Sequence, residues 1–399
     1  MSCVIFGAGK IARGFIGHLL YLSGIPFTLI EQSDDLVRQL TGRKSYTVNI
    51  LGSPEKNCVV TDFQVLGYSR KDRIIQAIAE ADTVFDAVGG KNLEALVPFL
   101  AAGIEKKAAG SRSAAEHMTD HLNIVTCENW KNPAEILRRG IEKELPDEAG
   151  AYYNERVGIT EAVIMRSAIE ATEAERAQDP LIVNVQDYWQ LHVDASRLKG
   201  PLPSIKGLHL LDNFDGFLEK KFYTYNAANG SVSYLGALLG YTFLADAAHD
   251  NRILRILDGV YRETSGALCQ KYGFSFEEQW AFTRTSLHKL QDRTIVDYIE
   301  RNARDPLRKL GPEDRLVGSA VLAASYGITP KNLCTAIAAA IFYTNEADPS
   351  AAALRRLREE EGIRGVISKV CRLDPDGDLG RLIMRQSEVL PSLQKEQSD

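Results

Sequence analysis

The segment CVIFGAGKIARGFIG, residues 3–17, constrains the fold of this chain more than any other stretch. A strand-like run leads into Gly7 and Gly9, Ala12 fills the next small position, and an apolar helix-like pattern follows. This is the G-x-G-x-x-G/A arrangement, in which a strand, a tight turn and a helix N-terminus present free backbone N–H groups to a pyrophosphate. We therefore predict a dinucleotide site that includes Gly7, Ala8, Gly9, Lys10 and Ile11.

Glu31 indicates which dinucleotide is bound. It ends the next strand-like run, FTLIE, about 20 residues after the loop, where an acid can accept hydrogen bonds from the adenosine ribose hydroxyls. The same carboxylate would repel the extra phosphate of NADP, so we predict NAD, although nearby Arg38 could soften this preference. A further run, TVFDAVGG, ends in glycines that let backbone pass close to the cofactor, which adds Val88 and Gly89 to the site.

The alternation of short strand-like runs with amphipathic stretches predicts a parallel sheet flanked by helices. Residues 181–193 look like a further strand, and the Gly- and Pro-rich segment LKGPLPSIKG after them marks a loop. From about residue 230 the apolar residues recur at helical spacing. We expect an α/β chain with a Rossmann-type, doubly wound NAD-binding domain over residues 1–205 and a mostly α-helical substrate-binding domain over residues 206–399.

Composition excludes several classes of protein. With 45% apolar residues, 25% charged residues and a net charge of -6, the 399-residue chain is predicted to be neither disordered nor a nucleic-acid-binding protein. Six scattered cysteines without a Cys-x-x-Cys pair argue against a zinc site or a disulfide framework, and His117 and His121 are interpreted as ordinary histidines, so no metal is expected. The apolar runs are too short to span a bilayer, which favours a cytoplasmic protein, a monomer or a dimer.

A lysine and two amides stand together in the aromatic stretch KKFYTYNAANG, residues 220–230. Four other motifs accompany this stretch: FGAGKIARGFIG, TCEN and LPSIKGLHLLDN before it and DPLRKLGPEDRL after it. Together these motifs, which extend over nearly the whole chain, resemble the polyol-specific long-chain dehydrogenases. The likeness is greatest to their mannitol-1-phosphate 5-dehydrogenase branch.

The resemblance implies roles for three residues. The family carries the signature K-x-x-x-x-N-x-x-H, in which the lysine is a general base without any metal and the asparagine holds the reacting oxygen. Carried over, these residues are Lys221 and Asn226, and Asn129 of TCEN matches a second asparagine that holds the oxygen. A free lysine titrates at about 10.4, so Lys221 needs burial or a neighbouring positive charge to act near neutrality.

Two positions depart from the family pattern. Asn229 stands where the signature has histidine, and Met165 precedes Arg166 where relatives have an acid. An amide cannot exchange a proton near neutral pH but can still hydrogen-bond a sugar hydroxyl, so we assign Asn229 to substrate binding. Arg301, in a basic cluster that resembles the family's C-terminal substrate wall, is assigned to substrate binding as a ligand for a sugar phosphate.

The prediction is an NAD-dependent oxidoreductase that interconverts a polyol, or a polyol phosphate such as mannitol 1-phosphate, and the corresponding ketose. The two departures favour a related but different polyol. Two alternatives remain open at this point. One is an epimerase or isomerase that retains NAD and re-reduces the same sugar, and the other is a non-catalytic NAD-binding regulatory protein.

Overall fold

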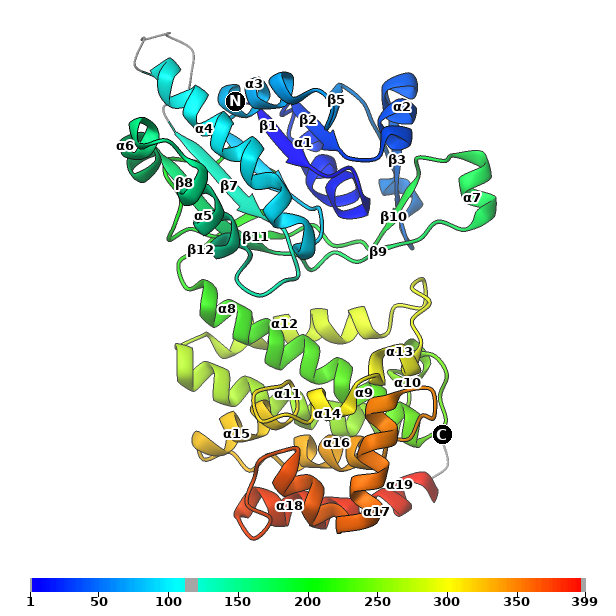
Figure 1. Cartoon of the computed structure of the whole chain (residues 1–399). Helices are drawn as coiled ribbons and strands as arrows, with labels where there is room; N and C mark the ends of the chain where they lie inside the picture. Colours follow the sequence, from blue (N-terminus) through cyan, green and yellow to red (C-terminus); the bar gives the residue numbers. More distant parts are fainter. Residues whose placement is uncertain (1, 112–120, 396–399) are drawn as a thin grey trace. The chain divides into compact units, whose positions relative to one another are not determined.

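The computed structural model describes residues 2–111 and 121–395, and the chain divides into two compact units, Met1–Phe214 and Asp215–Asp399 (Figure 1). The predicted boundary fell at residue 205. The first unit extends beyond it because β12 (Leu208–Leu211) pairs in parallel with β11 (Leu191–Asp194) and so belongs to the sheet of that unit.

An eight-stranded sheet forms the centre of the first unit, in the order β12-β11-β8-β7-β6-β1-β2-β5. The six strands from β8 to β5 in this order run parallel, and β11 pairs antiparallel with β8. The chain passes from β1 to β2 on one side and later returns to β6 on the other, which confirms the predicted doubly wound fold. The bounds are β1 (Cys3–Phe6), β2 (Phe27–Glu31), β5 (Phe63–Gly67), β6 (Thr83–Asp86), β7 (Leu122–Thr126) and β8 (Val157–Val163).

Apolar side chains on both faces of this sheet are buried, because helices cover each face (Figure 1). In β1, Cys3 and Ile5 pack into one core and Val4 and Phe6 into the other, as the alternation of side chains along a strand requires. The α-helices of this unit are α1 (His18–Leu22), α2 (Asp34–Arg43), α3 (Lys71–Glu80), α4 (Val97–Ser111), α5 (Pro133–Glu144), α6 (Asp147–Arg156) and α7 (Glu173–Gln178).

A second sheet, in the order β4-β3-β10-β9, lies in the same unit. The expectation of one strand over residues 181–193 was wrong, because this stretch contains β10 in the small sheet and β11 in the large one. Residues 186–190, between these two strands, belong to neither sheet. The strands are β3 (Tyr46–Ile50), β4 (Cys58–Val60), β9 (Ala168–Ile169) and β10 (Val183–Val185).

The second unit is helical, as predicted. Its core surrounds α16 (Lys331–Phe342), whose residues Leu333–Ile341 are all buried, so this helix is apolar on every side. Further helices of this unit are α8 (Phe214–Lys221), α9 (Ala227–Leu238), α11 (Asn251–Tyr272), α12 (Phe276–Leu290), α13 (Ile299–Ala303), α14 (Pro306–Lys309) and α15 (Val317–Ser325). The remaining helices are α10 (Leu244–Ala247), α17 (Pro349–Lys369), α18 (Asp378–Ser387) and α19 (Leu390–Lys395).

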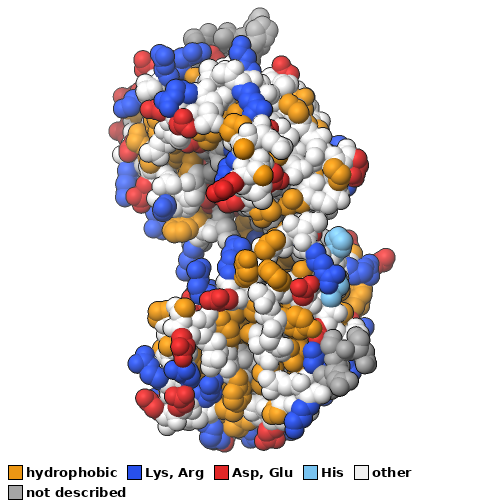
Figure 2. All heavy atoms as spheres, turned by 90° about the vertical axis from the view of Figure 1, so that its right-hand side faces the viewer, with side chains coloured by type: hydrophobic (Ala, Val, Ile, Leu, Met, Phe, Trp, Pro, Cys, Tyr) orange, Lys and Arg blue, Asp and Glu red, His pale blue; other side chains and the backbone are white. Residues whose placement is uncertain are grey.

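Charges of both signs are interspersed on the face of the molecule shown in Figure 2. This distribution agrees with the small net charge of -6. Within residues 2–111 and 121–395, no helix combines the length and the apolar character that crossing a membrane requires.

Candidate active site

The loop after β1 has the geometry of a phosphate-binding turn. Gly7 adopts φ +93°, and a Cβ atom at this position would lie 2.7 Å from the backbone oxygen of Ala87, so only glycine fits. Gly9 is exposed, and a Cβ there would meet nothing within 4 Å. The loop is therefore closely packed against the sheet at Gly7 and open at Gly9.

Arg13 fixes the peptide group between Ala8 and Gly9. Its Nε donates to the Ala8 oxygen at 2.7 Å and its Nη1 to the Leu181 oxygen at 2.6 Å, while the side chain is buried. In a planar trans peptide the carbonyl and the next N–H point in opposite directions, so the Gly9 N–H points away from Arg13. Among the described residues this N–H has no acceptor, which leaves it available for a phosphate.

The helix that follows the loop contains a π-helical segment, Ala12–Gly17. Two side chains from other parts of the unit take carbonyls of this segment: the Tyr46 hydroxyl donates to the Arg13 oxygen at 3.2 Å, and Arg166 Nη1 donates to the Gly14 oxygen at 2.8 Å. Arg166, which follows the atypical Met165, therefore supports the loop helix from inside the unit. The guanidinium also lies 4.5 Å from the centroid of the Trp189 ring.

Glu31, at the end of β2, holds the loop through both carboxylate oxygens. Oε2 accepts from the Ala8 N–H at 2.7 Å and Oε1 from the Ser33 N–H at 2.8 Å. A carboxylate offers about four acceptor positions, so these bonds leave capacity for ribose hydroxyls. Lys10 forms an ion pair with Glu170 at the surface, and Ile11 is half-buried in the first helical turn.

The ends of β6 and β7 carry the other residues assigned to the first unit. The Gly89 N–H donates to Glu128 Oε1 at 2.7 Å, while Asn92 Nδ2 donates to the Val88 oxygen at 2.7 Å. Asn129, next to Glu128, is exposed, and its amide has no hydrogen bond to any described residue. These residues lie beside β1, at the carboxyl edge where the strand order reverses.

Asp86, the last residue of β6, is a buried acid that sequence reasoning missed. It is 1% exposed, and neither carboxyl oxygen has a hydrogen-bond partner among the described residues. Burial, together with the negative charge of Glu128, raises the pKa of Asp86 well above its ordinary value. The neutral form of the side chain is therefore favoured, and the apolar pattern of TVFD does not distinguish it from an exposed strand-end acid.

In the second unit, one continuous helical run carries Lys221, Asn226 and Asn229. The run consists of α8, a π-helical segment at Phe222–Asn226, and α9. In a regular α-helix two residues five apart point about 140° away from each other, because each residue adds about 100°. Bonding from residue i to residue i+5, as between the Phe222 oxygen and the Ala227 N–H, places them close to one full turn apart. Lys221 and Asn226 therefore project from the same side of the helical run. Asn229, three residues after Asn226, lies in α9 on that side as well.

Lys221 is half-buried, and burial lowers its pKa. A second lysine, Lys289 on α12, lies close enough for the two charges to interact: burial and the charge of Lys221 lower the pKa of Lys289 to about 8. Burial is thus what lowers the pKa of Lys221, and the effect of the pair falls on Lys289. The sequence predicted that Lys221 would need burial or a neighbouring positive charge but offered no signal that Lys289 lies near it.

The neighbouring Lys220 has different surroundings. Its ammonium group lies 4.8 Å from the ring centroids of Phe274 and Phe282, which are cation–π distances. Phe282 in turn contacts the rings of Phe217 and Tyr225, with centroids 5.8 and 4.9 Å away. These aromatic residues form an apolar wall beside the π-helical segment.

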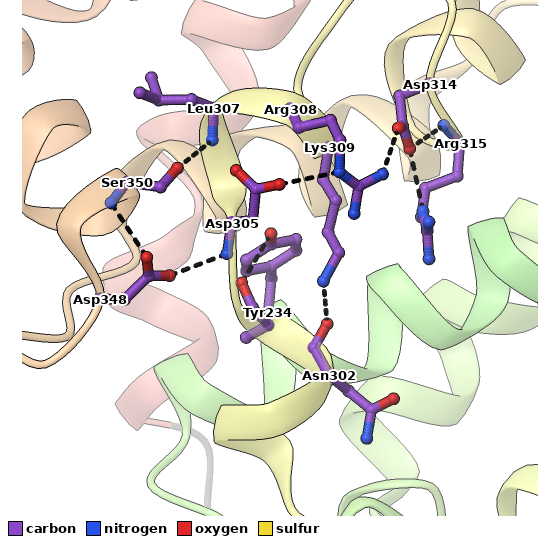
Figure 3. Close-up of polar contacts among 11 residues, drawn as sticks. Tyr234, Asn302, Asp305, Leu307, Arg308, Lys309, Asp314, Arg315, Asp348 and Ser350 are labelled. Atoms are coloured by element: carbon purple, nitrogen blue, oxygen red, sulfur yellow. Dashed lines mark hydrogen bonds and ion pairs between the residues drawn. The ribbon is translucent and has the colours of Figure 1, made fainter. Parts of the chain in front are cut away.

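Asn229 belongs to a polar network that reaches α13 and α14. Its Nδ2 donates to Asn302 Oδ1 at 3.1 Å. The ammonium group of Lys309 donates to the backbone oxygen of Asn302, as Figure 3 shows. Lys309 is only 6% exposed, and burial, with the charges of Arg315 and Arg308, lowers its pKa to about 8. Lys309 belongs to the basic cluster noted in the sequence, where only Arg301 was assigned a role.

Ion pairs partly neutralise this basic cluster, as Figure 3 shows. Arg308 bonds Asp305 at 2.8 Å and Asp314 at 2.9 Å, and Arg315 bonds Asp314 at 2.9 Å. Lys309 adds a third cation to these two carboxylates, while a further carboxylate, Asp297, accepts from Asn302 Nδ2 at 2.6 Å.

Arg301, in α13, lies at the surface. Its side chain is 74% exposed, lies 3.5 Å from Asp297, and helps line a cavity of about 350 Å³ together with Arg304 and Asn345. The residues that line this cavity do not include Lys221, Asn226 or Asn229. Arg301 therefore does not line a common cavity with the lysine and the two amides, although its partner Asp297 also bonds Asn302, and its assignment to the substrate stays a prediction.

No group of three or more His, Cys, Asp or Glu residues within residues 2–111 and 121–395 has a metal-binding arrangement. His117 lies outside the described residues. The six cysteines, four of them buried, are all free thiols.

Two family models match the chain in sequence. Residues 1–207 match the mannitol dehydrogenase Rossmann domain, and residues 213–370 match the mannitol dehydrogenase C-terminal domain. Among solved structures, the Pseudomonas fluorescens mannitol 2-dehydrogenase ternary complex with NAD and D-mannitol is 14% identical, with a TM-score of 0.67, and D-sorbitol dehydrogenase in substrate-free form is 13% identical, with a TM-score of 0.78. Each alignment covers 99% of this chain and 94% of the other, and at this identity the likeness shows the fold.

Proposed function

Because the chain belongs to the mannitol dehydrogenase family, we propose that it is an NAD-dependent dehydrogenase that interconverts a polyol and the corresponding ketose, with Lys221 as its general acid/base. The observation that carries this proposal is the π-helical segment between Lys221 and Asn226, which brings a lysine of lowered pKa and two amides to one side of a helix. Segments of this kind are rare and frequently mark functional sites.

The residues of the first unit fit a dinucleotide. The loop of residues 7–11 offers free N–H groups at a helix start, held in place by Arg13, and a methyl group at Gly7 would strike the backbone. Glu31 accepts the ribose hydroxyls, while Val88 and Gly89 line the other side of the turn. When bound, NAD supplies the acceptor for the hydride that leaves the substrate carbon.

The protein moves the proton. In polyol oxidation, the neutral amine of Lys221 takes the proton of the reacting hydroxyl as its carbon loses the hydride. Asn226 and Asn129 donate amide N–H groups to the oxygen and stabilise the negative charge that develops on it. In ketose reduction the ammonium form of Lys221 returns the proton. Burial brings the two forms of Lys221 closer in free energy, as both directions require.

We propose that the substrate carries an anionic substituent, as mannitol 1-phosphate and fructose 6-phosphate do. Support comes from Lys309, a buried ammonium group with a single hydrogen bond among the described residues. Ammonium groups and arginines are the usual ligands of phosphate oxygens. The free thiols fit a reducing compartment, which supports a cytoplasmic location.

The test follows NADH absorbance when purified protein meets a panel of ketoses and ketose phosphates that includes fructose 6-phosphate. We expect NADH oxidation, a loss of at least about 100-fold in Lys221→Met, and near wild-type rates in the matched variant Lys220→Met. NADH binding without oxidation by any ketose would refute the proposal. In that case tightly retained NAD together with sugar interconversion would identify an epimerase. The absence of any sugar interconversion would identify a binding protein.

A further inference from the structure

The amide of Asn229 has one orientation, which is set by a chain of side chains behind it. Asn302 Nδ2 donates to Asp297 Oδ1 at 2.6 Å and to the Tyr298 oxygen at 3.0 Å. A carboxylate and a carbonyl both lack hydrogens, so only the NH₂ group of Asn302 can face them. The oxygen of Asn302 must then face Asn229, which donates its own NH₂ group at 3.1 Å.

This relay leaves the Asn229 side-chain oxygen without a donor. No described residue donates to it, although the side chain is half-buried. The oxygen has two acceptor positions, and Asn229 lies three residues after Asn226 on the same side of α9. A group bound beside Asn226 is thus offered the unused oxygen of Asn229 as an acceptor.

We propose that Asn229 accepts a hydrogen bond from a free hydroxyl group of the substrate, and that Asp297 and Asn302 are positioning residues that hold it as an acceptor. This inference rests on the proposed dehydrogenase function. A hydroxyl carries the hydrogen that this oxygen needs, whereas a carbonyl or an ionised phosphate at the same point would face it oxygen to oxygen. The substrate class is therefore a sugar with an unmodified hydroxyl next to the group that Asn226 holds, and any phosphate lies further away.

The relay explains why an asparagine can serve here and what it changes. A histidine either donates or accepts, depending on its tautomer, and so tolerates either kind of partner. An asparagine whose NH₂ group is turned toward Asn302 presents its oxygen on the other side, and that oxygen can only accept. The site consequently discriminates against a substrate that lacks the hydroxyl, because the amide oxygen would be buried without a partner.

The experiment compares kcat/KM for the best ketose of the panel with kcat/KM for each of its singly deoxygenated analogues. For the wild-type protein we expect one analogue to lose about tenfold or more, which corresponds to one hydrogen bond. Asn229→Leu should remove the discrimination against that analogue alone. Asn302→Leu should reduce it several-fold, and the isosteric Asp297→Asn, which weakens one of the two acceptors that orient Asn302, should reduce it less.

Asn345→Ala is the matched control, because Asn345 Nδ2 bonds Glu300 of the same helix, α13, at 2.9 Å without joining the relay. Its discrimination ratio should equal the wild-type ratio, and all variants should keep their NADH affinity. If both Asn302→Leu and Asp297→Asn kept the wild-type discrimination ratio, the positioning role of the relay would be refuted. If Asn229→Leu kept the wild-type ratio, the contact between Asn229 and the substrate would be refuted. In either case ketose turnover leaves the dehydrogenase function intact, whereas a protein that reduces no ketose refutes that function and this inference together.

Discussion

Gly7→Ala and Gly9→Ala form a pair of substitutions that separates the two tasks of the phosphate loop. At Gly7 the backbone conformation, φ +93°, is unfavourable for alanine by about 1–3 kcal/mol. The added methyl group would also lie 2.7 Å from the Ala87 oxygen, which belongs to the backbone next to β6 and cannot rotate away. We expect Gly7→Ala to lower the free energy of unfolding of the first unit by about 3 kcal/mol. For a unit of this size that is a fall of about 6–12 °C in Tm.

Gly9→Ala should have the opposite profile. A methyl group there meets nothing within 4 Å, so stability should change by no more than about 0.5 kcal/mol. The methyl group would, however, stand on the open side of the loop, where the Gly9 N–H points. Losing one hydrogen bond to a charged phosphate weakens NADH binding by at least about tenfold.

Thermal unfolding followed by circular dichroism and NADH titration followed by fluorescence measure the two effects independently. Gly42→Ala is the control, since its methyl group also meets open space but lies in α2, away from the loop. It should keep the wild-type NADH affinity and be up to about 1 kcal/mol more stable. Wild-type stability in Gly7→Ala would refute the strain argument, and wild-type NADH affinity in Gly9→Ala would refute the approach of the phosphates to the loop.

Three further predictions concern charge. Glu31→Ser should weaken NADH binding and reduce the preference for NADH over NADPH by about tenfold in kcat/KM, because the carboxylate that repels the second phosphate is gone. The rate of polyol oxidation should rise with pH and level off above an apparent pKa that lies below that of free lysine, since only neutral Lys221 accepts a proton; a pH–rate profile measures this pKa. Lys309 has a pKa of about 8 when folded, against about 10.4 in an unfolded chain. The unfolded state therefore binds more protons between these values, stability should rise from pH 8 to pH 10 in urea titrations, and Lys309→Met should flatten that rise.

The strand, loop and helix around Gly7 could be predicted from sequence because local chemistry dictates them. A residue that must adopt positive φ next to a buried strand has to be glycine, and the free N–H groups follow from the helix start. The alternation of strand-like and amphipathic runs likewise predicted the doubly wound sheet. Residues 181–193 were assigned to one strand because an apolar run does not show which sheet it joins, and β10 pairs with β3, more than 100 residues earlier.

Partners that come from distant residues are the part that sequence cannot supply. Asp86, Lys289 and Lys309 are ordinary charged residues in the sequence, and only burial by other segments shifts their pKa values. The acceptor role of Asn229 depends in the same way on Asp297, which lies 68 positions later. Resemblance to a family signature marked residue 229 as changed, but the direction of its hydrogen bond follows only from the folded network.

The two π-helical segments show where a sequence pattern does contain the necessary information. Near Gly14, tertiary contacts accompany the π-helical bonding, since Tyr46 and Arg166 donate hydrogen bonds to backbone carbonyls that a regular helix would use itself. The local sequence gives no sign of these two contacts. Between Lys221 and Asn226, the spacing is sufficient. Two side chains that act on one substrate oxygen must project from one side of their helix, and a separation of five residues meets this condition only if bonding shifts from i+4 to i+5. A lysine and an asparagine five apart, with functions on the same atom, thus predict a π-turn between them.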